Sequence, residues 1–306
     1  MSVLINGIKY QLIKELGKGG NGKVYIAISE NENEIYAIKT ISIDELSDEE
    51  IELIENEAKI LSSIDDEHIV KYYGSTKDSN TFYILMEFCG GSDLKKFINE
   101  FKKNNEFIEE YIIYRIVLDL CLGIKKIHDN NLIHRDLKPE NLFITEDYKI
   151  KIGYFGISKQ MDSNNQYANT YVGTNNYMAP EVIKGEKYNN KVDIWALGCI
   201  IYELLTLNVC FESKCLFGFV DKILNKSHGK IDINKYNSKW QNIIDLLLKK
   251  DYKERPNIGD VFQSIIDMEK KFCIKMINKN ELADLENKGK VLFRANSKII
   301  FNLLFD

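Results

Sequence analysis

The spacing of apolar residues divides the chain into two differently built parts. Up to about residue 88, apolar residues occur in short β-rich runs separated by turn residues, which is typical of strands. One helix interrupts them, because residues 49–64 carry apolar side chains three and four positions apart. Ser47 followed by Glu50 is a capping box at the start of this helix. The predicted strands are residues 10–17, 22–29, 35–41, 69–76 and 81–88.

From about residue 93 the pattern is mainly helical, apart from a strand-and-loop region at residues 133–159. A small β-rich lobe joined to a larger helical lobe is therefore expected, and the cleft between two such lobes is a preferred ligand site. The predicted helices are residues 93–103, 109–130, 192–207, 238–250 and 258–272.

Composition places the chain among globular proteins that work inside the cell. The chain has 306 residues, of which 44% are hydrophobic and 28% are charged. A net charge of −5 does not favour a nucleic-acid or anionic-membrane partner. Six scattered cysteines without C-x-x-C pairs indicate reduced thiols, and the N-terminus lacks the pattern of a secretory signal. A cytoplasmic or nuclear location is expected.

The longest apolar stretch, residues 194–211, raises the alternative of a membrane span. It contains Glu203 and Asn208 and is preceded by Asp193, so it is interpreted as a core helix.

A glycine-rich segment, "LGKGGNGKVY", spaces its glycines as G-x-G-x-x-G. Glycines let a turn lie close over phosphates and offer backbone N–H donors. A dinucleotide site has the same spacing but leads from a strand into a helix. Here the segment leads into another strand, which favours a β-hairpin flap, and a plain flexible hairpin turn is the alternative.

A lysine in the next strand gives the hairpin a possible partner in phosphate binding. Lys39 lies in "YAIKTI", and a lone strand lysine is usually a solvated residue at a sheet edge. Glu57 lies on the following amphipathic helix. A Lys39–Glu57 pair in a cleft would fix an ammonium group at a polyphosphate.

The strongest signal is "HRDLKPEN", residues 134–141, which brings several catalytic residue types together. Asp136 can accept the proton of an attacking hydroxyl. Lys138 can neutralise charge on a phosphoryl group, and Asn141 can ligate a divalent cation through its side-chain oxygen. His134 is interpreted as a packed, hydrogen-bonded histidine rather than a catalyst.

These motifs resemble those of eukaryotic protein kinases over residues 10–272. The glycine-rich loop, Lys39, Glu57 and "HRDLKPEN" match, as do "APE" at 179–181, "DIWALG" at 193–198 and "ERP" with Arg255. Lys138 and "GTNNYMAPE" are similar to the serine/threonine branch. "KPENLFITEDYKIKIG" and "WALGCIIYELLTLNVCFES" resemble the NIMA-related kinases.

The resemblance implies an α+β, bilobal protein-kinase fold. A small antiparallel β lobe with one helix would span residues 1–88, a larger mainly helical lobe residues 89–272, and a C-terminal extension residues 273–306. It also implies transfer of the γ-phosphate of ATP to Ser or Thr of a protein substrate, with Mg²⁺ as cofactor.

The resemblance further assigns roles to single residues. The implied catalytic residues are Lys39, Glu57, Asp136, Lys138 and Asn141. Met86 would be the gatekeeper of the adenine pocket, Glu87 and Cys89 would offer backbone groups to adenine, and Val24, Ala37 and Phe143 would sandwich the ring. The implied ATP-binding residues are Gly17, Gly19, Gly22, Val24, Ala37, Lys39, Met86, Glu87, Cys89 and Phe143.

Regulation is implied in the same way. Arg135 is the arginine type that pairs with a phosphorylated activation loop, and Thr170 is the favoured phosphosite, with Thr174 also in this segment. An ion pair from Glu181 to Arg255 would anchor the segment.

Position 154 departs from the family pattern. The sequence there reads Tyr154-Phe155-Gly156, where the family has an aspartate that binds Mg²⁺. A phenol is neutral at pH 7 and bulkier, so it is a poor ligand for a cation that prefers anionic oxygens. The expectation is that Mg²⁺ binding is weakened or lost. Because the other catalytic residues are present, either a recent natural loss or a deliberate point substitution would explain the tyrosine.

Three functional classes stay open: a weak active kinase, a pseudokinase that binds nucleotide without metal, and an interaction protein. The third depends on residues 273–306, where "KVLFRA" and "KIIFNLLF" are apolar and β-prone. They form either a tail packed on the helical lobe, or the start of a second domain or a partner-docking segment.

Overall fold

The structure is a computed structural model, and the residues it describes group into two compact units that divide between Cys89 and Gly90. The described residues are 1–19, 22–31, 34–145, 149–153, 176–213 and 215–277, without the side chains of Leu53, Glu57, Ile60, Leu61 and residues 269–277.

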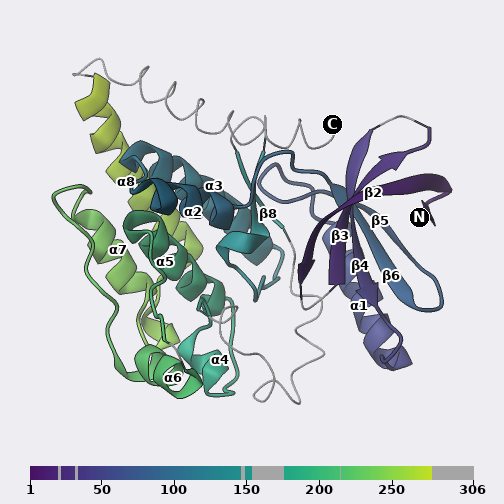
Figure 1. Cartoon of the computed structure of the whole chain (residues 1–306). Helices are drawn as coiled ribbons and strands as arrows, with labels where there is room; N and C mark the ends of the chain where they lie inside the picture. The colour runs from purple at the N-terminus through teal and green to yellow at the C-terminus, as the bar shows by residue number, and fades with distance from the viewer. Residues whose placement is uncertain (20–21, 32–33, 146–148, 154–175, 214, 278–306) are drawn as a thin grey trace. The chain divides into compact units, whose positions relative to one another are not determined.

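The N-terminal unit, residues 1–89, is built on a six-stranded antiparallel sheet with the strand order β1-β2-β3-β4-β6-β5 (Figure 1). The central strands bury side chains on both faces: Ala37 and Met86 belong to one buried cluster, and Ile38 and Leu85 to another. The strands are β1 (Ser2–Ile5), β2 (Ile8–Gly19), β3 (Gly22–Ser29), β4 (Ile35–Ser42), β5 (Tyr72–Lys77) and β6 (Thr81–Glu87).

Among its described residues this unit has one helix, α1 (Asp48–Ser62), which begins at the predicted capping box. The N–H of Ser47 donates to Glu50 Oε2 over 2.7 Å, and the N–H of Glu50 donates to Ser47 Oγ over 3.3 Å. Ile54 and Ala58 of α1 are buried against residues of β4 and β6, so the helix covers one face of the sheet.

The C-terminal unit, residues 90–277, is mainly helical and contains one small two-stranded sheet among its described residues (Figure 1). Helix α3 packs against α5 and α8, and α5 also packs against α7. The helices are α2 (Leu94–Asn104), α3 (Glu110–Asp129), α4 (Pro180–Ile183), α5 (Lys191–Thr206), α6 (Leu216–Asn225), α7 (Lys239–Leu247) and α8 (Ile258–Ile277). The short 3₁₀ turns are η1 (Pro139–Asn141) and η3 (Tyr252–Glu254), and the strands are β7 (Leu142–Ile144) and β8 (Ile150–Ile152).

Helix α5 lies at the centre of this unit and is buried around most of its circumference. A side chain at Gly198 would meet Leu247 Cβ and Leu248 Cδ2, each at 2.9 Å, so only glycine permits the close approach of α7. The apolar stretch that began at residue 194 thus forms a core helix, as predicted. No helix of the described residues has the length and apolar content that a membrane crossing requires.

Candidate functional site

In the N-terminal unit, one face of the sheet carries the predicted nucleotide-binding side chains. Val24 is paired with Lys39, and Ala37 with Met86. Paired residues and alternate residues of a strand point to the same side, so all four side chains share a face. Lys39 lies in β4, which is hydrogen-bonded on both sides, and only 8% of the residue is exposed. Lys39 is therefore not a solvated lysine at a sheet edge, which was the alternative interpretation.

Helix α1 covers this same face, because Ile54 and Ala58 pack with Ala37 and Met86. Glu57 lies on α1, but its side chain is outside the described part of the structure. The Lys39–Glu57 ion pair therefore stays a prediction.

The glycine-rich segment forms a hairpin between two strands. Gly19 at the end of β2 is paired with Gly22 at the start of β3. Gly22 has φ +117°, and a side chain there would come within 1.8 Å of the Thr40 carbonyl oxygen. The strand-to-strand connection excludes a dinucleotide fingerprint, which needs a helix at this point.

The end of β6 supplies backbone groups at the predicted adenine pocket. The N–H of Glu87 donates to the Lys71 carbonyl over 2.8 Å, so this N–H is committed within the sheet. Cys89 is half-buried, and Phe143 lies in β7 of the C-terminal unit. The predicted adenine site draws on both units, and its assembly stays a prediction.

In the C-terminal unit, the loop that contains η1 brings Asp136, Lys138 and Asn141 together. Lys138 Nζ lies 2.9 Å from Asp136 Oδ2. Asn141 Nδ2 donates to the same oxygen over 3.0 Å and to the Asp136 carbonyl over 2.7 Å. The carboxylate thus has a fixed orientation next to a cation, an arrangement suited to receiving a proton beside a negatively charged phosphoryl group.

A second carboxylate, Asp193 at the start of α5, holds the backbone of this loop. It accepts the N–H of His134 over 2.9 Å and the N–H of Arg135 over 3.0 Å, and it also contacts His128 Nε2 at 2.8 Å. Arg135 has φ +68°, a left-handed conformation that costs energy for a residue with a side chain. Asp193 therefore stabilises this strained part of the backbone. The sequence motifs had not predicted this role for Asp193.

His134 is buried and packed, as predicted. Its Nδ1 accepts the N–H of Asp136 over 3.2 Å, which leaves Nε2 as the donor to the Gly153 carbonyl at 3.0 Å. Both ring nitrogens therefore act in positioning the loop.

Of the two expected Mg²⁺ ligand positions, the structure describes only Asn141. Both amide hydrogens of Asn141 point to Asp136, and no donor in the described ranges contacts its Oδ1, which can therefore face a cation. No group of three or more His, Cys, Asp or Glu side chains suited to a metal occurs within those ranges. Asn141 thus offers one neutral oxygen to a divalent cation, and the weakened Mg²⁺ binding expected from position 154 stays a prediction. Tyr154 lies outside the described residues.

Of the residues predicted to act in regulation, the structure describes only Arg135. Thr170 and Thr174 lie outside the described residues. Arg135 Nε is buried and has no hydrogen-bond partner in the part of the chain that the structure describes.

A charged network centred on Glu203 was not predicted from the sequence. Glu203 of α5 is buried; Lys95 Nζ lies 2.6 Å from its Oε1, and the Tyr177 hydroxyl donates to its Oε2 over 2.5 Å. Burial and the nearby Glu203 charge raise the pKa of Tyr177 well above its usual range, so it stays a donor. Burial also raises the pKa of Glu140. The sequence did carry a signal for this network. Glu203 lies within an otherwise apolar helix, and a buried carboxylate requires partners.

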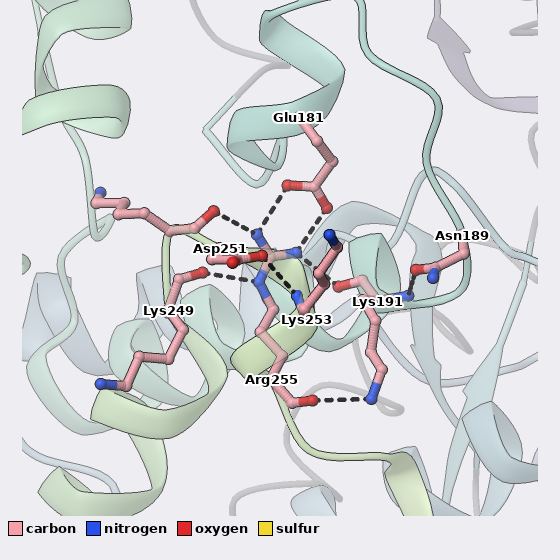
Figure 2. A network of polar contacts seen from close by, with 8 residues as sticks. Glu181, Asn189, Lys191, Lys249, Asp251, Lys253 and Arg255 are labelled. Carbon is pink, nitrogen blue, oxygen red and sulfur yellow. Dashed lines mark hydrogen bonds and ion pairs between the residues drawn. The ribbon is translucent and has the colours of Figure 1, made fainter.

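The Glu181–Arg255 ion pair is confirmed (Figure 2). Arg255 Nη1 and Nη2 each lie 2.7 Å from one carboxylate oxygen of Glu181. The remaining guanidinium hydrogens donate to carbonyl oxygens, including that of Lys249 over 2.8 Å and that of Lys191 over 2.9 Å. The side chains are 0% and 2% exposed, so the pair is a buried, fully hydrogen-bonded anchor for α4.

Comparison with known proteins agrees with this geometry. The protein kinase domain family matches residues 10–266. The mouse serine/threonine-protein kinase Nek1 is 35% identical over 271 residues, which cover 89% of this chain and 22% of Nek1. The probable serine/threonine-protein kinase nek2 of Dictyostelium discoideum is 34% identical over 258 residues, or 83% of this chain and 61% of that protein.

The G2-specific protein kinase nimA of Emericella nidulans is 33% identical over 285 residues, or 84% of this chain and 40% of nimA. The chain thus spans from about a fifth to three fifths of the length of these relatives. With the catalytic loop, the buried anchor and the family match in agreement, the chain belongs to the protein kinase family, in which it is similar to the NIMA-related serine/threonine kinases.

Proposed function

We propose that this chain is a NIMA-related kinase domain that binds ATP and transfers its γ-phosphate to Ser or Thr of protein substrates, with a rate impaired by Tyr154. The observation that carries the proposal is the assembled loop around Asp136, in which Lys138, Asn141 and Asp193 fix the carboxylate and its backbone. A protein that had long lost this chemistry would be free to lose these contacts. We place its action inside the cell, in the cytoplasm or nucleus, on the basis of its scattered cysteines.

The residues would share the work as follows. The Lys39 ammonium binds the nucleotide phosphates from its buried position in β4. The Asp136 carboxylate accepts the proton of the attacking hydroxyl. Lys138, held 2.9 Å from Asp136, offsets negative charge on the group in transfer.

A pseudokinase is the second candidate, and it is favoured by the tyrosine at position 154. In this alternative the fold binds nucleotide without metal and acts through contacts with other proteins. The two candidates share ATP binding and differ in whether a Ser or Thr hydroxyl receives phosphate.

The first expected result concerns nucleotide and metal. ATP should raise the melting temperature of the purified chain, and Mg²⁺ should add little, because only Asn141 remains of the two expected ligands. A thermal-shift titration of ATP with and without Mg²⁺ measures this. Lys39→Met should reduce the shift, whereas Lys14→Met, which changes an exposed lysine of β2, should not. A large gain that requires Mg²⁺ would contradict the proposed metal defect.

Regulation is tested in a background in which Tyr154→Asp restores phosphotransfer. Phosphate on Thr170 should pair with Arg135 and so position the loop beside Asp136. Thr170→Ala should then lower the rate severalfold without weakening ATP binding, and Arg135→Ala should lower it about equally. The double variant should lose no more than either single variant, because both changes remove the same interaction. Additive losses in the kinase assay would show that the two residues act independently.

A further inference from the structure

The start of the chain lies outside the stretch that matches the protein kinase family, because the match begins at residue 10. It is nevertheless built into the N-terminal sheet. All four residues of β1 pair with β2, and the N–H of Leu12 donates to the Met1 carbonyl over 2.9 Å. The chain thus adds a strand at one edge of the sheet. Residues 1–7, which form this strand and the turn after it, are called the strap below.

The strap covers the face of the sheet that α1 does not cover. Ile5 is 0% exposed and belongs to a buried cluster with Ile38 of β4 and Leu85 of β6, and Val3 packs against this cluster. Leu4, between them, points the other way and is 61% exposed, as the alternation of a strand requires. The strap therefore does for this apolar face what α1 does for the other.

The strap also reaches the opposite edge of the sheet. Strands β1 and β5 stand at the two ends of the strand order, yet they contact each other. Asn6 Nδ2 donates to the Tyr73 carbonyl over 3.0 Å. A side chain at Gly74 would come within 2.5 Å of Asn6 Nδ2 and 3.1 Å of Ile5 Cγ2, so the glycine leaves room for the strap. The two edges of the sheet are thus tied together at this point.

The Asn6 contact falls on an irregular part of β5. The pairing of β5 with β6 shifts register around Tyr73, so this residue is left out of the ladder. Its ring packs edge-on against Tyr36 of β4, with centroids 5.3 Å apart. The preceding residue, Tyr72, is paired with Met86, which was predicted to line the adenine pocket. Asn6 therefore holds the bulge of β5 next to the end of β6.

We propose that residues 1–7 are an intramolecular strap that belongs to the folded N-terminal unit of this chain and holds the β5 bulge in place. When seated, the strap completes the apolar face and ties β2 to β5. When released, it would free the bulge beside Met86, while the face under α1 would stay covered. The family boundary at residue 10 thus cuts off a part that this chain needs.

Hydrogen exchange of the full chain, followed by mass spectrometry, tests the hold on β5. Asn6→Asp keeps the size of the side chain and its tolerance of the positive φ of +51°, but it removes the N–H donor. We expect amide exchange in the peptide that covers β5 to become about two- to tenfold faster, the change in local opening that one lost hydrogen bond produces. Exchange in α1 should stay unchanged.

A matched pair of variants tests the cover over the apolar face. Ile5→Ala leaves a cavity in the buried cluster and should lower the melting temperature by several degrees. Leu4→Ala, on the exposed side of the same strand, should change neither the melting temperature nor the exchange of β5.

Three results would overturn the proposal. These are parental exchange of β5 in Asn6→Asp, equal acceleration of β5 and α1, which would show a general loss of stability, and an Ile5→Ala chain as stable as Leu4→Ala. The assays contain no nucleotide or substrate, so their outcome is independent of phosphotransfer.

Discussion

Replacing Tyr154 with aspartate should raise phosphotransfer to a generic Ser/Thr substrate by on the order of a hundredfold or more, the scale on which a lost transition-state electrostatic contact is felt. An aspartate supplies an anionic oxygen to complement the neutral oxygen of Asn141, and Mg²⁺ prefers such ligands. Tyrosine supplies a phenol that is un-ionised at pH 7. Incorporation of labelled phosphate from ATP and Mg²⁺ into a protein substrate measures the gain.

Two further variants isolate the cause of this gain. Tyr154→Phe removes the hydroxyl without adding a carboxylate, so its rate should stay close to that of the parent chain. Asp136→Asn, added to Tyr154→Asp, should abolish the gain because the proton acceptor is lost. If the Tyr154→Asp chain is as inert as its parent, the defect lies elsewhere and the pseudokinase function is favoured.

The elements that were predicted are those whose signal is local. Strands and helices followed from the spacing of apolar residues, and the capping box at Ser47 placed the start of α1 to within a residue. The strand predicted from residue 69 begins instead at Tyr72. Strand ends depend on partners across the sheet, and β5 pairs with β6 only from Tyr72 onward.

Strand β1 was missed although the chain carried a signal for it. Asn6 and Gly7 have φ +51° and +79°, the positive angles of a two-residue hairpin turn. An Asn-Gly pair between apolar runs is the strongest short-range hairpin pattern, and it would have predicted β1 pairing with β2. Helix α6 had a weaker signal, because its first turn contains Gly218 and its cap is the sulfur of Cys215.

The residues of the candidate site likewise divide into those with a local sequence signal and those without one. Asp136, Lys138 and Asn141 could be read from the sequence because they occupy one short loop. Asp193 could not be given its role, because it reaches the Arg135 N–H across 58 positions of the sequence. Such contacts depend on how α5 packs against the loop, and spacing along the chain does not encode that packing.

Removing the Arg255 guanidinium should destabilise the C-terminal unit by about 3–5 kcal/mol, the usual cost of breaking a buried ion pair. Arg255→Met keeps an aliphatic side chain of similar length, but it leaves the Glu181 carboxylate buried without its partner. The carbonyl oxygens of Lys191 and Lys249 also lose their donors. Both tryptophans of the chain, Trp195 and Trp240, lie in this unit, so urea unfolding followed by tryptophan fluorescence reports on it directly.

The loss of stability should come from the Glu181 carboxylate that is left buried and unpaired, rather than from the missing attraction between the two side chains. In a double-mutant cycle, Glu181→Leu combined with Arg255→Met should therefore cost less than the sum of the two single changes, because no buried charge is left alone. Lys184→Met is the matched control: its partner Glu186 lies 3.9 Å away and both side chains are about half exposed. Breaking this surface pair should change stability by less than about 1 kcal/mol. If Arg255→Met costs no more than Lys184→Met, the Glu181–Arg255 pair does not stabilise the unit.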